Sequence, residues 1–489
     1  MKKLYKFLCV IMTIFISFNL VSCKNTNDDN NDVSKNVVPE EQIETPVIEC
    51  NHNYEFTNIS IAEDSEVSRP GIYTCSKCNH QKTQSLTYED IGLPTIDFKG
   101  SLDGISKENE LKISLSYNSE ELKFDCDAKI KVQGASSSLL PKKNYTIKLY
   151  KSGTNFDKKH KVELVDGWGE ENKYCLKANY IDYSQARNVV SGKLYGQIVK
   201  SRNNGDNLEE LYNGGAIDGY PVVIFLNGSF LGLYTMNIPK DKWLFDMDDY
   251  DPEDDAEIRK EAILMADGWT ESTALREPIN PNYVSSQWEL EFCSTEEYEE
   301  VGTDWVAESF NEFIAFLNNN NGYELKEHLD EYIDVERAID CFIYTNMIFA
   351  GDNTAKNMLW VTYDGGDTWI PSMYDMDGTW GLFCGGTLYE TDYIKKTILS
   401  NNELYNKLQL FYAEEIKERY IELRSSVLSY SNIEEEFKTF FDLIPDFVRE
   451  AEKSKWPDVH SQETNNFDHI LNFTGLRLSL LDEYFIFKQ

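Results

Sequence analysis

The feature that most constrains the fold is a run of three segments in which apolar and polar residues alternate. They read LKISLSY, KFDCDAKIKVQG and KNYTIKLY, and all lie between residues 111 and 150. Successive side chains of a β-strand point to opposite faces, so this alternation predicts half-buried strands. A further strand pair is predicted in PVVIFLNGSFLGLYTMNIP, where an Asn-Gly turn separates two apolar runs. The first half of the chain is therefore expected to be rich in β-structure.

Helical periodicity takes over later in the chain. DYSQARNVVSGKLYGQIV, from Asp182, begins with a capping-box pattern, and from Asp304 apolar residues recur three and four positions apart. An acidic segment at about 246–303 reads as loop-rich, and NMLWVTYDGGDTWIPSMYD predicts one hairpin inside the helical half. The region from about 401 to 489 is again helical. The predicted fold class is α+β in two lobes, with a strand-rich N-lobe and a helical C-lobe.

Composition limits the partners of this fold. The chain has 489 residues, of which 41% are hydrophobic and 13% aromatic, enough for a sizeable core. Its net charge is -37, and such an acidic surface repels phosphate backbones, so nucleic acid is not an expected partner. Binding of ATP would need local positive charge or a metal ion. The stretch from Lys123 to Lys161 is lysine-rich against the trend of the chain.

The N-terminus predicts export. MKKLYK is basic, FLCVIMTIFISF is apolar but short for a bilayer span, and LVSC ends in Cys23. This ending resembles the lipobox of bacterial lipoproteins, which implies a signal peptide at 1–22 and a lipid on Cys23. Residues 23–48 are polar and acidic and read as a disordered tether. The expected location is extracytoplasmic, anchored in the membrane at the cell surface; an ordinary cleaved signal or a single membrane anchor is the alternative.

A short segment after the tether has the ligands of a metal site. CNH supplies Cys50 and His52, and CSKCNH supplies Cys75 and Cys78 with a spare histidine. Two thiolates spaced Cys-x-x-Cys suit tetrahedral Zn²⁺, so residues 49–88 are expected to form a small zinc-ribbon-like module with a structural ion. A disulfide is the alternative. The cysteines in the rest of the body are expected to be buried free thiols: Cys126, Cys175, Cys293, Cys341 and Cys384.

Three polar residues surround the hairpin of the helical half. Asp352 and Asn357 stand five positions apart in GDNTAKNMLW, and Asp375 ends the second strand. Phosphoryl transfer needs one Asp near the attacking hydroxyl and an Asn and a second Asp to hold Mg²⁺ against the phosphates. Protein kinases use an Asp-x-x-x-x-Asn spacing, a hairpin and a further Asp for these tasks. The pattern therefore predicts a kinase-type metal site.

The chain resembles the spore-coat protein H (CotH) kinases, an atypical family of protein kinases. The resemblance covers roughly residues 90 to 485 and rests on QGASSSLLPKKNYTIKL, NYIDYSQARN, VIFLNGSFLGLYTMNIPKDKW, GDNTAKNMLW and WIPSMYDMDGTWG. It implies a kinase-like domain over 90–489. It also implies ATP- and metal-dependent phosphoryl transfer to Ser or Thr of proteins, with Mg²⁺ or Mn²⁺.

The resemblance also implies roles for individual residues. Asp352 would be the catalytic Asp, acting with Asp375; Asn357 and Asp375 would be Mg²⁺ ligands, and Asp377 could assist a second metal ion. The nucleotide would be held by three candidates: Trp369 for stacking on adenine, and Lys143 or Lys148 for the phosphates. In protein kinases a His-Arg pair precedes the catalytic Asp, whereas Ala350 and Gly351 precede Asp352 here.

Two functions of different classes follow from these features. The first is an extracytoplasmic kinase that phosphorylates surface or coat proteins. The second is a kinase-like surface-binding or structural lipoprotein with little catalysis, which lipidation, the tether and the Cys/His module also suit. Binding of ATP and metal distinguishes the two.

Overall fold

The structure is a computed structural model that describes residues 50–487, apart from 64, 204, 206, 254, 384 and 460–465. The predicted signal peptide, the tether, Cys23 and Cys384 lie outside the described residues. Contacts divide the chain into two units, Met1–Asn51 and His52–Gln489, and of the first unit only residues 50 and 51 are described. Among the described residues, no helix is both long and apolar enough to cross a bilayer.

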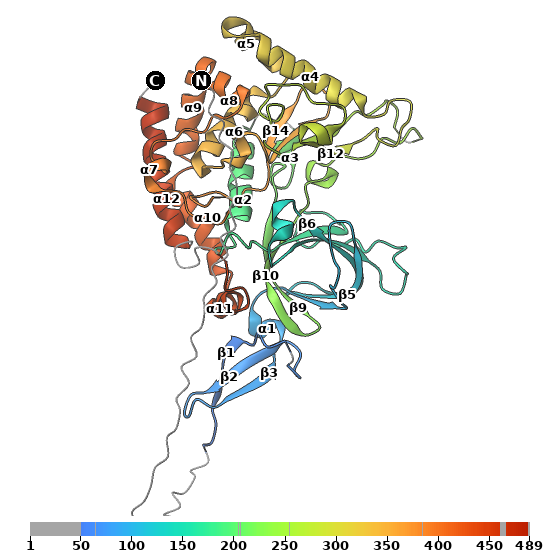
Figure 1. Ribbon diagram of the computed structural model, residues 1–489, viewed down its shortest axis with the longest axis vertical. Helices are drawn as coiled ribbons and strands as arrows, with labels where there is room; N and C mark the ends of the chain where they lie inside the picture. Colours follow the sequence, from blue (N-terminus) through green and yellow to red (C-terminus); the bar gives the residue numbers. More distant parts are fainter. Residues whose placement is uncertain are drawn as a thin grey trace, which may run out of the picture. The chain divides into compact units, whose positions relative to one another are not determined.

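Seven strands of the second unit close into a barrel, in the order β10-β8-β7-β6-β5-β4-β9 (Figure 1). Neighbouring strands are antiparallel except for β4 and β9, which are parallel. Closure leaves this sheet without an exposed edge. The strands are β4 (Thr95–Lys99), β5 (Leu111–Asn118), β6 (Lys123–Gln133), β7 (Asn144–Tyr150), β8 (Lys173–Lys177), β9 (Gly219–Leu226) and β10 (Ser229–Asn237).

The sequence alternation sets the two faces of the barrel. On β6, for example, Ile130 and Val132 are buried, whereas Lys131 between them is only half-buried. The three alternating segments are confirmed as β5, β6 and β7. The Asn-Gly turn is also confirmed: Asn227 and Gly228 have φ of 50° and 86°, as a tight hairpin turn between β9 and β10 requires.

A second sheet has the order β12-β11-β13-β14. Its strands are β11 (Ala262–Ala266), β12 (Trp288–Cys293), β13 (Met358–Thr362) and β14 (Ile370–Met373). The predicted hairpin is confirmed as β13 and β14. The reading of 246–303 as loop-rich is wrong in one respect, because β11 and β12 lie within it and pair with the hairpin. The two strands were not predicted because they are short and many acidic residues surround them.

The helices fill most of the second half of the unit, as predicted. Helix α6 (Val335–Ile348) is buried on all sides from Arg337 onward, which makes it the central helix. The mixed α+β class is therefore confirmed, whereas the two-lobed kinase-like arrangement stays a prediction. The remaining helices are α1 (Tyr88–Ile91), α2 (Arg187–Lys200), α3 (Asn207–Glu210), α4 (Asp304–Asn319), α5 (Gly322–His328), α7 (Thr391–Ile394), α8 (Glu403–Phe411), α9 (Ala413–Arg424), α10 (Tyr430–Asp442), α11 (Asp446–Lys455) and α12 (Phe467–Leu481).

The capping-box prediction at Asp182 is wrong. Helix α2 begins at Arg187, and its N-cap Ala186 makes no side-chain cap hydrogen bond. The Asp182 carboxylate instead accepts from the Arg187 backbone N–H at 2.9 Å and from its guanidinium at 2.6 Å. A buried charge partner five residues away has replaced the local cap.

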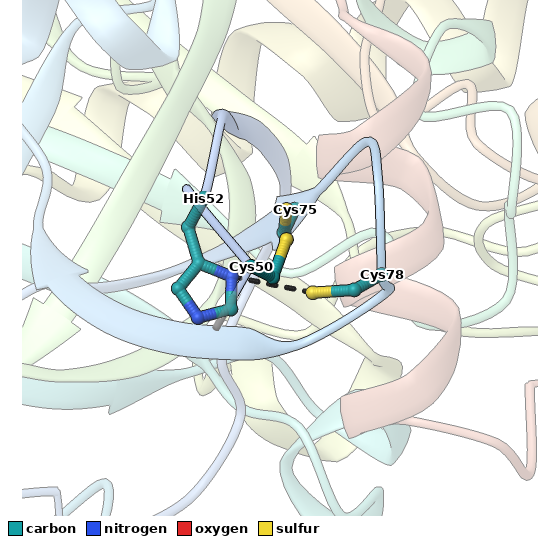
Figure 2. Close-up of side chains that lie close together, drawn as sticks. All are labelled: Cys50, His52, Cys75 and Cys78. Atoms are coloured by element: carbon teal, nitrogen blue, oxygen red, sulfur yellow. Dashed lines mark hydrogen bonds between the residues drawn. The ribbon is translucent and has the colours of Figure 1, made fainter. Parts of the chain in front are cut away.

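The predicted Cys/His segment carries a third sheet, in the order β1-β2-β3. Its strands are β1 (Tyr54–Ile59), β2 (Pro70–Cys75) and β3 (Gln81–Ser85). Cys75 ends β2 and Cys78 lies in the turn that follows, so the hairpin between β2 and β3 presents both thiols on one side (Figure 2). Phe56 of β1 packs edge-on against Phe447 of α11, with ring centroids 4.8 Å apart.

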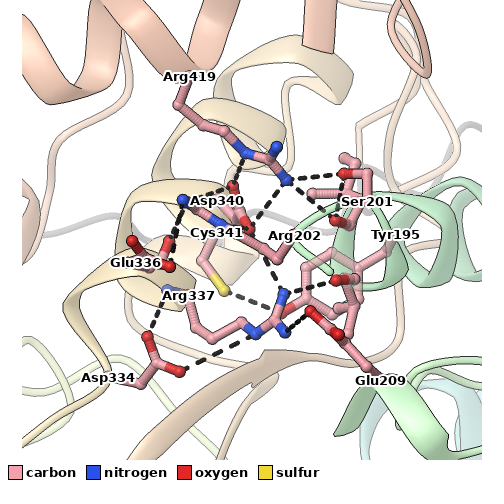
Figure 3. Close-up of polar contacts among 12 residues, drawn as sticks. Tyr195, Ser201, Arg202, Glu209, Asp334, Glu336, Arg337, Asp340, Cys341 and Arg419 are labelled. Carbon is pink, nitrogen blue, oxygen red and sulfur yellow. Dashed lines mark hydrogen bonds and ion pairs between the residues drawn. The ribbon is translucent and has the colours of Figure 1, made fainter. Parts of the chain in front are cut away.

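A buried carboxylate joins three helical segments. Asp340 of α6 is fully buried and accepts from Arg202, which follows α2, at 2.9 Å and from Arg419 of α9 at 2.7 Å (Figure 3). The guanidinium of Arg337 lies 3.7 Å away. Several cations share this one anion, and its hydrogen bonds compensate for the cost of burying it.

We predict that Asp340→Asn lowers the free energy of unfolding by about 3–5 kcal/mol, because removing one partner leaves buried guanidinium groups uncompensated. Urea unfolding followed by circular dichroism measures the change. The matched control is Asp392→Asn, since Asp392 pairs with Lys396 at 3.1 Å on the surface, with 80% and 72% of the two side chains exposed. The control should be nearly neutral, and equal effects of the two variants would contradict the interpretation.

Candidate active site

A cavity of about 690 Å³ lies against the outer face of the barrel. Alternate residues of β6, β7 and β8 form one wall, because the residues between them fill the barrel interior. The other wall includes the open end of the β13–β14 hairpin and the turn before it. The residues from the barrel wall include Lys131, Gln133, Thr146, Lys148, Lys173, Cys175 and Lys177, and those from the hairpin side include Asp352, Lys356, Asn357, Tyr374, Asp375 and Asp377.

The cavity reverses the charge balance of the chain. Eight lysines line it, against six aspartates and glutamates, in a chain whose net charge is -37. The barrel wall is basic and the hairpin side is acidic. A polyanion could therefore lie on one side of the cavity and a cation on the other.

The hairpin brings Asn357 and Asp375 together at its open end. Asn357 precedes β13 and Asp375 follows β14, with φ of 56° and 52°. The Tyr374 N–H donates to the Asn357 carbonyl at 3.0 Å, and the Asn357 amide lies 3.4 Å from the Asp375 carbonyl. The buried Asn353 amide donates to the carbonyls of Asn357 and Tyr374 at 3.1 and 2.9 Å. These contacts hold two non-glycine residues in a conformation that costs energy, which is common at functional sites.

Lys177 links the two walls. It ends β8, is buried, and places its Nζ 3.5 Å from the Asp375 carboxylate and 3.4 Å from the Tyr374 hydroxyl. Burial opposes its charge, but Tyr374 and Asp375 raise the pKa of Lys177 above its usual value, so the ammonium is charged at neutral pH. Sequence reasoning missed this residue. The signal available was the parity of Lys173, Cys175 and Lys177 in KYCLK, a segment not recognised as a strand.

The aspartates of the hairpin side repel one another. Burial and then Asp375 raise the pKa of Asp377 well above its usual value. Burial also raises the pKa of Asp352, with a further contribution from Asp375, whereas Lys356 and Trp269 oppose the rise. Asp352, Asp375 and Asp377 also line a small adjoining cavity. Such a group of carboxylates fits a hard divalent cation, which would relieve the repulsion.

The two lysines predicted to hold phosphates lie in different places. Lys148 lines the cavity. Lys143 does not, because its Nζ donates to the carbonyls of Ser138 and Leu140 and so closes the loop that follows β6. Gly134 begins this loop with φ of 98°, and a Cβ there would lie 2.0 Å from the Ser137 hydroxyl, so only glycine fits.

The end of the same loop is anchored by a buried ion pair. The Lys142 ammonium lies 2.6 Å from the Glu452 carboxylate of α11, and both side chains are buried. Lys142 also donates to the carbonyls of Ala178 and Leu233. The segment between β6 and β7 is therefore fixed to the C-terminal part of the unit.

The prediction for Trp369 is wrong. Its side chain is fully buried and packs edge-on against Phe310, with ring centroids 5.0 Å apart. It does not line the cavity, so no face of the indole can stack on a base. Phe310 belongs to α4, which covers the side of the hairpin that Trp369 occupies.

Helix α2 holds the segment that carries Asp375 and Asp377. The Asn188 side chain accepts from the Met376 N–H at 3.0 Å, and the buried Arg187 donates to the Thr379 carbonyl at 2.9 Å. Asn188 itself lines the cavity. Sequence reasoning missed Asn188 because no local pattern marks a contact across 188 positions.

The Cys/His cluster is a separate candidate metal site. The ligand atoms of Cys50, His52, Cys75 and Cys78 lie within 4.8 Å of one another, with the Cys78 sulfur 3.2 Å from His52 Nδ1 (Figure 2). Against the effect of burial, hydrogen bonds from the Lys77 backbone and the His52 ring lower the pKa of Cys75 to about 5. Among the described residues, no other group of such ligands gathers as closely, the cavity aspartates included. Two or more thiolates with a histidine suit Zn²⁺.

We predict that the purified chain carries about one equivalent of zinc and that Cys78→Ser loses most of it, because tetrahedral zinc sites need four ligands. Mass spectrometry of the metal, combined with thiol titration, measures both. Ser76→Ala changes the same turn without removing a ligand and should keep the metal. A zinc-free chain whose cysteines resist titration would instead support the disulfide.

Comparison with known proteins agrees with this geometry. The family described as CotH kinase protein matches residues 130–481, which include β7, β8, α2, the β13–β14 hairpin and the cavity residues of each. No curated protein matches the chain. The family match spans well over half of the sequence, and the chain therefore belongs to the CotH kinase family.

Proposed function

We propose that this protein is an extracytoplasmic, metal-dependent kinase that transfers the γ-phosphate of ATP to Ser or Thr of surface or coat proteins. Membership of the CotH kinase family supports kinase activity. The observation that carries the proposal is the pairing of Lys177 with Asp375, 3.5 Å apart, in one cavity with Asp352, Asn357 and Asp377. Kinases need such a lysine opposite the metal-binding residues.

The basic wall would hold the triphosphate. Lys177 is the lysine nearest the aspartates, and Lys148 and Lys173 lie on the same face of the barrel. The glycine-led loop that begins at Gly134 borders the same cavity, and its backbone N–H groups could contact phosphate oxygens. A local excess of lysine answers the objection that an acidic chain repels nucleotides.

Asn357, Asp375 and Asp377 would hold Mg²⁺ or Mn²⁺. The raised pKa of Asp377 and the mutual repulsion of the carboxylates fit a bound divalent cation. When bound, the ion neutralises charge that develops on the phosphates. The chain's part is to hold these oxygens in place, through the Asn353 contacts to both ends of the hairpin and the Asn188 contact to Met376.

Asp352 would act on the acceptor. Its carboxylate takes the proton of the Ser or Thr hydroxyl as that oxygen bonds to the γ-phosphorus. The bond from the γ-phosphorus to the β-phosphate oxygen breaks, and ADP leaves with Lys177 opposite its phosphates. Lys356, 4.0 Å from Asp352, favours the ionised form of the base.

The location and the second metal complete the proposal. A lipid on Cys23 would anchor the chain at the outer side of the membrane, where the acceptors are other surface proteins. Structural Zn²⁺ at the Cys/His cluster would fix the turn between β2 and β3. The barrel and the helical part would act as the two lobes of a kinase, with the nucleotide bound in the cavity between them.

We predict that the full chain with Mg²⁺ or Mn²⁺ transfers labelled γ-phosphate to itself and to casein. Asp375→Ala should reduce the rate by about a thousandfold, because it removes a ligand of the metal ion that would neutralise the charge developing on the phosphates. Asp392→Ala, on the exposed surface, is the matched control and should keep full activity. Equal labelling by wild type and Asp375→Ala, with both folded by circular dichroism, would contradict the mechanism.

We also predict the pH dependence. A base must be ionised, so the rate should fall as the pH falls through the pKa of Asp352, which burial raises above the usual Asp range. Lys356→Met removes a cation that favours ionisation, so the acid limb of kcat/KM should move to higher pH by about half a unit. Lys438→Met, which removes an exposed lysine of α10 paired with Asp442, should leave the limb in place. A limb that does not move with Lys356→Met would exclude Asp352 as the titrating base.

A further inference from the structure

The outer face of the barrel carries four lysines in one row across β5, β6, β7 and β8. Lys112 of β5 lies directly opposite Lys129 of β6. Lys129 in turn lies opposite Lys148 of β7, which lies opposite Lys173 of β8. Directly opposed residues of antiparallel strands point to the same face, and like charges placed in this way destabilise a sheet. These four residues, called the lysine row below, occur in a chain whose net charge is -37.

Aromatic rings help to position the outer half of the lysine row. The Lys112 ammonium lies 4.5 Å from the centre of the Phe156 ring, and the Lys129 ammonium lies 5.3 Å from the centre of the Tyr150 ring. A ring attracts the cation but uses few of its N–H donors. Lys129 also lies 3.5 Å from Glu110, whereas Lys112 has no carboxylate at ion-pair distance in the part of the chain that the structure describes. The outer ammonium groups are therefore held in place with donors left for another anion.

The inner half of the lysine row lines the cavity. Lys148 and Lys173 belong to the cavity wall, whereas Lys112 and Lys129 lie outside it. Lys173 pairs with Asp241 at 2.6 Å, but no described carboxylate pairs with Lys148. Burial lowers the pKa of Lys148, and the neighbouring lysines lower it further against the effect of a nearby glutamate. Unpaired positive charge thus continues from the open surface of the barrel into the cavity.

The dimensions of the lysine row fit an extended acidic peptide. Neighbouring strands lie about 4.8 Å apart, so the four lysines span about 14 Å. Alternate residues of an extended chain are about 7 Å apart, so carboxylates at positions i, i+2 and i+4 also span about 14 Å. Carboxylates are also the partners that the row already has, in Glu110 and Asp241. A segment with Asp or Glu at alternate positions would therefore place its side chains along the row.

Two other polyanions fit the lysine row less well. Single-stranded nucleic acid binds through bases that stack on open aromatic faces. The Tyr150 and Phe156 rings each have a lysine over one face and contact each other edge-on. A flat bilayer cannot follow the row, because the inner half lies in a cavity. Charge and shape together favour an acidic polypeptide.

We propose that the lysine row is a docking surface for an extended acidic segment of the protein acceptor. The outer pair, Lys112 and Lys129, would bind this segment on the open surface of the barrel. Docking beside the cavity would raise the local concentration of the acceptor hydroxyl there. The inference rests on the proposed function only for the purpose of docking, because binding of an acidic segment requires neither ATP nor phosphoryl transfer.

Fluorescence anisotropy of the full chain with a labelled peptide of alternating Glu and Gly tests the docking directly. Wild type should bind this peptide and should not bind the matched peptide of alternating Gln and Gly. Lys112→Gln combined with Lys129→Gln should weaken binding by about tenfold, because two exposed charge contacts are lost. The control combines Lys396→Gln with Lys438→Gln, which removes the same charge from two exposed lysines that pair with aspartates outside the barrel. The control should keep the wild-type affinity.

Three results would overturn the proposal. Equal losses of affinity in the two double variants would show that the overall charge, and not the lysine row, attracts the peptide. Tighter binding of oligothymidylate or of phosphatidylserine vesicles at the row would assign it to another polyanion. Should the double variant fail to fold, Lys112→Glu reverses the charge of one exposed side chain and should also weaken binding, so an unchanged affinity in that variant would count equally against the proposal.

Steady-state kinetics separates docking from catalysis. With a serine peptide that carries the same Glu-Gly segment, the double variant at Lys112 and Lys129 should raise the peptide KM by the factor seen in binding. The kcat and the KM for ATP should not change, because neither residue lines the cavity. Transfer with an unchanged peptide KM would overturn the docking surface and leave the kinase in place. Wild type that binds the acidic peptide but transfers no phosphate would contradict the proposed kinase and support the docking surface.

Discussion

Lys177 carries its charge inside the wall of a barrel, where burial alone would favour the neutral amine. The charge is kept because Asp375 reaches it from the hairpin, 3.5 Å away. The same pairing limits the repulsion among the aspartates on the hairpin side. At the cavity, barrel and hairpin are therefore joined by an ion pair. A ligand that binds there contacts the lysines of one wall and the aspartates of the other.

Three strands of the barrel were predictable because apolar and polar residues alternate along them, and alternation is a local property, whereas β8, which is buried along most of its length, was not recognised. β5, β6 and β7 follow from the letters alone, as does the turn at Asn227. β11 and β12 were not predicted, because AILMA is too short to separate strand from helix and its surroundings are acidic. Closure of the barrel was also out of reach, since the parallel pairing of β4 with β9 joins residues more than a hundred positions apart.

The residues of the candidate site also fall into those that the sequence could predict and those that it could not. Asp352, Asn357 and Asp375 were predictable because one hairpin carries all three, so their spacing in sequence translates directly into space. Lys177 and Asn188 were not, because they reach the hairpin from β8 and α2, and only the tertiary fold sets that approach. Trp369 shows the converse error: the resemblance implied a contact with adenine, but the sequence could not show that Phe310 covers the indole.

The buried pair of Lys142 and Glu452 spans 310 positions of the chain. The loop that borders the cavity is thus completed by a residue close to the carboxyl end. A chain cut by a protease before α11 leaves the Lys142 ammonium beside the carbonyls of Ala178 and Leu233, without its carboxylate partner. A chain truncated before α11 therefore lacks the ion pair that fixes the loop beside the cavity, so an intact C-terminal part is needed to complete the cavity.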